Sequence, residues 1–523
     1  MRGWCILAIA LAPAVLAVWM APVFVTQDGP AHLYNAHILN ESLRANSPFR
    51  GVFQVNWSPL PNWSGHLLLM GLLSLVSPRA ADRLATTIPL IGFAASAFWL
   101  RRRVAGRRGE LTAAVVSALL ALNVAWLLGF TSFLLGACLF PVTLGLWWIG
   151  RHRVNGKWAL GLASLIVLGY FAHLVSLGLT VVGLGLLAMA TPGRSRARIG
   201  WTAAGLLPLL VLGPVYRILM GRGGPIVPVW GHLRRTPWAI ASWREQLGWV
   251  DPLSLGRKVV VPFLPGQTAW LGIVTPAALV ALAVVILITT TWTRRDRNLR
   301  GWGILAAVLL VGGLVTPDTL GASHGNYLPQ RVALLGLVAL LAWVDLDLSR
   351  WPGKVATGLL LAALMLQSLT VWDYAFESSD RVGPFARSRE HVGKEARVGT
   401  LLIGIRGRFR ANPVLHADNL LGIGTGNIVW ADYETVHYYF PVQFSPDVRR
   451  PPAHTFEAIA NMDDPNDAAG RAKLWDDLLA AHHTEIDILV VWGRDPVLDE
   501  ISAKWFAANP FREDGPLRLF RHR

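Results

Sequence analysis

Residues 26–37 of the chain read TQDGPAHLYNAH and follow directly after the first apolar segment, residues 4–25. A segment of that length can span a bilayer, which places the stretch at the membrane surface. The stretch carries one acid, two imidazoles and a proline suited to the first turn of a helix. Most of the remaining chain is soluble in hydrocarbon, so reactive side chains are few. We therefore interpret the rest of the protein as a scaffold that holds Asp28 and a set of basic residues at one face of a bilayer.

The composition is that of a membrane protein. Of the 523 residues, 53% are hydrophobic and only 15% are charged, and the mean hydropathy is +0.43. These values exclude an ordinary soluble protein and predict a polytopic α-helical membrane protein. The 24 tryptophans agree, because their rings concentrate at membrane–water interfaces. Cys5 and Cys138 lie in apolar runs and form no zinc or redox motif, so a structural disulfide is not expected.

The net charge of +16 is unevenly distributed along the chain. Residues 1–371 contain 30 Lys and Arg against 10 acids, whereas residues 372–523 contain 18 against 22. The basic excess lies in short loops between apolar segments, which is typical of cytoplasmic loops that contact anionic lipids. The pattern therefore indicates membrane lipids, and not nucleic acid, as partners.

The basic loops also predict the topology. If all of them are cytoplasmic, about eleven segments cross the membrane, the N-terminus lies in the cytoplasm and the C-terminal region lies outside. We expect a multi-pass protein of the cell inner (plasma) membrane whose first span is an uncleaved anchor. The apolar segment 63–76 is too short to cross and is interpreted as a re-entrant or interfacial helix. The predicted spans lie near residues 4–25, 84–100, 110–128, 131–149, 158–171, 173–191, 201–219, 269–292, 301–316, 331–347 and 354–371.

The composition divides the chain into a transmembrane domain, residues 1–371, and an extracytoplasmic soluble domain, residues 372–523. Period and turn signals predict an α/β or α+β fold for the second domain. Its expected strands lie at residues 397–405, 486–492 and 517–520, and its expected helices at 467–482 and 496–508. The outer loops predicted for the first domain are residues 26–62, 217–268 and 317–330.

Asp28 is the leading candidate for catalysis, since few acids of the first domain lie on its outer face. An aspartate before Gly29 and Pro30 is also a good helix cap, so capping and a catalytic or metal-binding role both stay open. His32 lies four residues later, where a helix would bring it beside Asp28 to share a proton or a divalent ion. Two ligands do not make a metal site, so the cofactor is unknown and a divalent metal at Asp28 and His32 stays open.

Basic side chains expected on the outer face form a second group. Guanidinium forks match phosphate bidentately, and a lipid phosphate would lie at their height in the membrane. Arg331 stands out because it opposes the positive-inside trend, and His173 is a single imidazole at the outer tip of a short hairpin. Simple snorkelling at the interface is the alternative interpretation. The candidate substrate-binding residues are His173, Arg217, Arg222, His324, Tyr327 and Arg331.

The order of several short motifs resembles the glycosyltransferase C superfamily, which includes protein mannosyltransferases and aminoarabinose lipid A transferases. After the first span comes an outer loop that opens with Asp28, and then PLPNW at residues 59–63 leads into a short apolar helix. SPRAADRL at residues 77–84 is similar to the family's small-acidic-Arg-Leu segment, and RRRVAG follows at residues 101–106. The terminal outer domain also fits. The family commonly has two adjacent acids in the first loop, whereas Gly29 follows Asp28 here.

The resemblance implies an enzyme that moves a sugar from a polyprenyl-phosphate donor to a lipid, glycan or protein acceptor. It implies that Asp28 acts as base or metal partner, and that basic groups near His173 and Arg331 meet the donor phosphate. The implied reaction inverts the anomeric carbon. A lipid-linked polysaccharide polymerase or ligase, a transporter or flippase, and a membrane-anchored binding module are the competing interpretations.

Overall fold

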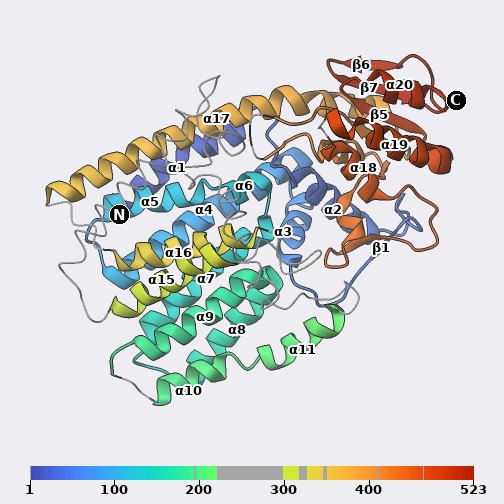
Figure 1. Cartoon of the computed structure of the whole chain (residues 1–523). Helices are drawn as coiled ribbons and strands as arrows, with labels where there is room; N and C mark the ends of the chain where they lie inside the picture. The colour runs from blue at the N-terminus through green and yellow to red at the C-terminus, as the bar shows by residue number, and fades with distance from the viewer. Residues whose placement is uncertain are drawn as a thin grey trace.

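Helices fill most of the structure, and a small β-sheet lies toward the C-terminus (Figure 1). This computed structural model describes residues 2–193, 196–220, 299–316, 327–344, 350–407, 409, 411–462 and 465–523. The expected span 269–292 lies outside the described residues, as do most of the expected loops 217–268 and 317–330.

The helices of the first part are α1 (Arg2–Met20), α2 (Gly29–Ser42), α3 (Trp63–Leu73), α4 (Pro78–Ala105), α5 (Glu110–Ala121), α6 (Val124–Leu128), α7 (Thr131–Gly150), α8 (Gly156–Ala172), α9 (Leu174–Ala190), α10 (Arg196–Gly205), α11 (Leu209–Met220), α15 (Arg300–Val315), α16 (Leu328–Trp343) and α17 (Trp351–Val392). Six helical stretches within the described residues are long and apolar enough to cross a membrane, by length and composition. Five shorter apolar helices accompany them, among them α3, α8 and α9.

Local sequence explains where several helices begin and break. Ser77 starts α4 by accepting the backbone N–H of Ala80 with its side chain, and Pro78 occupies the first helical position. The expected span 110–128 is divided into α5 and α6, because the Asn123 side chain caps a new helix at the N–H of Trp126. The long apolar run 158–191 breaks at His173, as the sequence predicted.

Helix α17 is 42 residues long and continues through the boundary expected at residues 371 and 372. The composition becomes polar there, but buried residues still recur on one helix face, for example Tyr374, Ser378, Val382 and Phe385. That face packs first against residues 23–25 and then against the C-terminal region, so the helix does not end with the apolar segment. In Figure 1, α17 runs from the helical part of the molecule to the sheet.

The C-terminal sheet has five strands in the order β3-β2-β5-β7-β6. Strands β2, β3 and β5 pair in parallel, with Val398 opposite Ile488, and β7 pairs antiparallel to β5 and β6. The strands are β2 (Arg397–Leu402), β3 (Ile428–Val429), β5 (Ile488–Trp492), β6 (Arg512–Asp514) and β7 (Leu517–Arg521). The helices that accompany them are α18 (Ala453–Asn461), α19 (Ala468–His482) and α20 (Pro496–Ala503).

The helix expected at 496–508 is wrong in its C-terminal part, because α20 ends at Ala503. Phe506 instead forms an antiparallel bridge with His522 beyond β7 and is fully buried. Tertiary pairing therefore overrides the helical pattern of these last residues.

The loop after α1 and the C-terminal region share structure. Strand β1 (Phe53–Val55) pairs antiparallel with β4 (Val442–Phe444), and the rings of Phe53 and Phe444 stack with their centroids 4.9 Å apart. One apolar cluster contains residues of α2, α3 and α4 together with Ile423, Val429 and Val442. The loop after the first helix is thus packed between the helices and the C-terminal residues, where α2 and α3 lie in Figure 1.

Candidate active site

Asp28 immediately precedes α2 and lies at the junction between the helices and the C-terminal region. Its carboxylate makes no capping hydrogen bond to α2, so helix capping does not explain this residue. It accepts a hydrogen bond from Gln27 Nε2 (3.3 Å), and one oxygen lies 3.8 Å from Nε2 of His416. The residue is 9% exposed. Burial raises the pKa of Asp28 to about 7, although the neighbouring His32 partly opposes the rise.

His32 has a different carboxylate partner from the one expected. Its Nδ1 pairs with Glu434 Oε1, and its Nε2 lies 3.1 Å from the carbonyl oxygen of Gly129. Burial lowers the pKa of His32, but the charge and hydrogen bond of Glu434 raise it to about 9. The i to i+4 spacing does place His32 close enough to interact electrostatically with Asp28. The direct hydrogen bond, however, is made to the C-terminal region.

Glu434 and His66 are site residues that sequence analysis missed. Glu434 lies on a short 3-10 turn, η3 (Tyr433–Val436), and its second oxygen is 2.8 Å from Nε2 of His66 on α3. Burial would raise the pKa of Glu434, but His66 and His32 together lower it below its usual range. No periodicity could reveal this contact, because Glu434 is 402 positions from His32 and 368 from His66.

Helix α2 itself holds the η3 turn in place. Asn35 Nδ2 donates to both carboxylate oxygens of Asp432 at 3.0 Å, and Asp432 in turn accepts the backbone N–H of Glu434. Burial raises the pKa of Asp432 well above its usual value, and the charge of Glu434 raises it further. Glu434 thus lies within electrostatic reach of two other acids at this junction, Asp28 and Asp432.

The end of α6 and the turn that follows it, residues 127–130, contact the acidic group on one side. The backbone N–H of Asp28 donates to the carbonyl of Leu128 (3.1 Å), and His32 bonds to the carbonyl of Gly129. The next residue, Phe130, faces the basic side of the site: the Arg331 guanidinium lies 4.7 Å from its ring centroid. One four-residue segment therefore contacts both Asp28 and Arg331.

Arg331 and His173 come together from different helices. Arg331, on α16, also lies over the ring of Phe133, and its Nη1 is 2.8 Å from Nε2 of His173 at the break between α8 and α9. A guanidinium can only donate, so Nη1–H of Arg331 donates to Nε2 of His173, and the imidazole orients the guanidinium. A guanidinium held in this way suits an anionic oxygen.

The Tyr439 hydroxyl interacts electrostatically with both the acidic residues and Arg331. Burial raises the pKa of its hydroxyl, and the charge of Glu434 raises it further. Arg331 lowers the pKa of the same hydroxyl and Asp28 raises it, so all three charges reach this one side chain. Asp28, Glu434 and Arg331 thus all lie near the Tyr439 hydroxyl.

The comparisons with known proteins agree with this architecture. No known protein-family profile and no curated protein sequence matches the chain. The solved structure of ArnT from Cupriavidus metallidurans bound to undecaprenyl phosphate does match: the TM-score is 0.55 and the sequence identity 12%, over 99% of this chain and 98% of ArnT. This chain has the ArnT fold.

The fold that the resemblance predicted is therefore confirmed, and the apolar helices agree with a polytopic helical membrane protein. The apo structure of the same ArnT gives a TM-score of 0.47 at 14% identity, over 99% of this chain and 98% of ArnT. Arabinofuranosyltransferase AftD from Mycobacteria gives 0.48 at 17% identity, over the whole of this chain and 40% of AftD.

Within this ArnT fold, the remaining candidates from the sequence are placed as follows. Tyr327 lies at the start of α16 with its ring 5.3 Å from that of Phe130, next to Arg331. Arg217 is exposed on α11 and, among the described residues, makes no hydrogen bond or ion pair with either group. Arg222 and His324 lie outside the described residues.

Gly129 leads to a prediction about the turn that contacts Asp28 and His32. Its φ is +86°, and a Cβ atom there would lie 2.7 Å from Thr26 Oγ1 and 3.1 Å from the backbone nitrogen of Asp28. Gly129→Ala is therefore expected to reduce the free energy of unfolding by about 1–3 kcal/mol. Chemical denaturation in detergent measures this change. Gly71→Ala on α3, where a Cβ meets open space, is the matched control and should be neutral or slightly stabilising. Equal stability of the two variants would contradict the prediction.

Proposed function

We propose that this protein is a membrane glycosyltransferase that transfers a sugar from a polyprenyl-phosphate donor to an extracytoplasmic acceptor. The observation that supports the proposal is that residues 127–130 contact Asp28 on one side and Arg331 on the other. ArnT, whose fold the chain shares, has been solved with undecaprenyl phosphate bound. A lipid-linked donor would also explain why the site lies at the junction of apolar helices with a polar region.

In the proposed reaction Asp28 is the base. As the acceptor oxygen forms a bond with the anomeric carbon, its proton moves to the Asp28 carboxylate, and the bond between that carbon and the phosphate oxygen breaks. The polyprenyl phosphate leaves with the bonding electrons, and the sugar is inverted. The guanidinium of Arg331, oriented by His173, stabilises the negative charge that grows on the departing phosphate. The aromatic rings of Phe130 and Phe133 hold the guanidinium in position.

The proposal includes the topology predicted from the sequence. The N-terminus lies in the cytoplasm, about eleven segments cross the inner membrane, and α3 is the re-entrant or interfacial helix. Residues 372–523 then lie outside, with η3 and the Tyr439 side chain over the site. The fully buried position of Glu434 against α2 and α3 supports an outer region that closes the site.

A donor assay tests the proposed function. Purified full-length protein is incubated with a panel of radiolabelled polyprenyl-phosphate sugars, with and without candidate acceptors, and lipid products are separated by chromatography. We expect one donor to be consumed with release of free polyprenyl phosphate. Movement of an intact lipid-linked sugar across a vesicle membrane, with no donor consumed, would favour a flippase instead. A glycan chain that grows on the lipid would favour a polymerase.

A further inference from the structure

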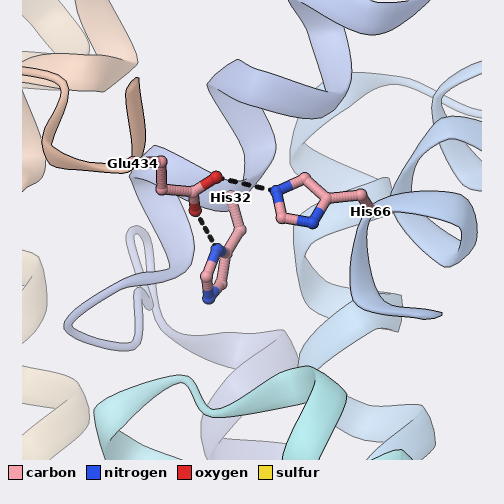
Figure 2. Close-up of side chains that lie close together, drawn as sticks. All are labelled: His32, His66 and Glu434. Carbon is pink, nitrogen blue, oxygen red and sulfur yellow. Dashed lines mark hydrogen bonds and ion pairs between the residues drawn. The ribbon is translucent and has the colours of Figure 1, made fainter. Parts of the chain in front are cut away.

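A buried carboxylate lies between two imidazoles at the junction of three segments (Figure 2). Glu434 comes from η3, His32 from α2 and His66 from α3. The Glu434 side chain is 0% exposed and that of His66 is 2% exposed. Oε1 faces His32 Nδ1 and Oε2 faces His66 Nε2, so each imidazole points one nitrogen at the same carboxylate. One possible metal-ligand atom from each of the three residues lies within 4.8 Å of the other two.

The charge around this group favours a cation. A buried carboxylate is costly unless it is paired, and the Glu434 carboxylate is fully buried between the two imidazoles. Without an ion, at least one of the imidazoles must be protonated in the interior to compensate it. A divalent cation would compensate the carboxylate while both imidazoles stay neutral.

The contact between His32 Nε2 and the carbonyl oxygen of Gly129 is of the kind that metal-binding histidines make. An imidazole that binds a metal through one nitrogen commonly donates its other N–H to a backbone carbonyl, which fixes the tautomer and the ring orientation. His32 Nε2 lies 3.1 Å from the carbonyl oxygen of Gly129, so a metal-bound neutral His32 would keep its proton on Nε2 and present Nδ1 to the ion, on the side that faces Glu434. This observation is independent of the spacing of the three ligands.

The ligand types select the metal. Magnesium and calcium prefer oxygen ligands, whereas two imidazole nitrogens and one carboxylate oxygen form a common zinc set with a fourth position left for a further ligand. We propose that His32, His66 and Glu434 bind one zinc ion, which fastens the η3 turn to α2 and α3. The ion would hold the outer region against the helix that begins next to Asp28. This inference stands on the three side chains and does not depend on the proposed function.

Metal analysis of the purified protein tests the site directly. Full-length protein is purified in detergent without chelator and without a polyhistidine tag, and zinc is measured by mass spectrometry. We expect about one zinc ion per chain, and a loss of about tenfold or more in Glu434→Gln and in His66→Gln. His454→Gln, an exposed histidine on α18, is the control and should retain the metal. Wild-type protein without zinc, which also takes up none when zinc is added, would overturn the proposal.

Thermal unfolding separates a zinc site from a simple ion pair. A strong chelator should lower the Tm of the wild type, zinc should restore it, and neither should change the Tm of Glu434→Gln. If the three residues form only a hydrogen-bonded group, chelator will not change the wild-type Tm although Glu434→Gln still lowers it. That outcome would overturn the proposal. The wild-type measurements need no variant, so they decide the question even if a variant fails to fold.

Discussion

Asp28→Asn is expected to reduce sugar transfer by about 10²–10⁴-fold, the range associated with loss of a positioned general base. The amide has nearly the same shape as the carboxylate but cannot accept the acceptor's proton. The fold should survive, because the carboxylate makes no capping hydrogen bond to α2. Burial also favours the neutral form of this side chain, so removal of its charge should not destabilise the protein. Transfer rate and Tm are measured on the same preparation.

The control for this variant is Glu41→Gln on the same helix, whose carboxylate pairs with the exposed Arg44. It also replaces an acid of α2 by its amide, and we expect wild-type transfer from it. Wild-type turnover in Asp28→Asn would remove Asp28 from the reaction. A large fall in Tm with loss of transfer would instead assign Asp28 a structural role.

Arg331→Ala is expected to reduce kcat/KM for the lipid-linked donor by about 10²–10³-fold, as does the loss of one donor that stabilises developing negative charge. The guanidinium supplies a charged N–H fork beside His173 and is held over two aromatic rings. Alanine removes the charge, the fork and the stacking at once. Initial rates at varied donor concentration separate the loss into KM and kcat.

Arg331→Lys makes this test more specific. Lysine retains the positive charge but has no planar fork to stack on Phe130 and Phe133, so it should recover only part of the lost activity. Arg44→Ala, which removes an exposed arginine, is the control and should leave donor kinetics unchanged. If Arg331→Ala lowers the Tm while kcat/KM for the donor stays at the wild-type value, Arg331 supports the helices and does not bind phosphate.

The sequence predicted several helices because their boundaries depend on local interactions. The break at His173 and the short helix after Trp63 both follow from segment length and flanking residues, and both are present. His173 and Arg331 were each selected singly, as an unusual basic group between apolar segments, and the structure brings Nε2 of His173 within 2.8 Å of Nη1 of Arg331. Their contact with each other could not be predicted, since 158 positions separate them.

The sequence by itself determined the helical membrane architecture and the position of Asp28 directly after the first apolar helix. Hydrophobic runs, helix caps and basic loops act over a few residues, so the helices that they specify can be predicted from the sequence. Only the tertiary structure decided that His32 pairs with Glu434 and His66, and that β1 completes a sheet with β4. Those contacts depend on how the C-terminal region packs on α2 and α3. Packing between segments hundreds of residues apart leaves no periodic pattern in a single sequence.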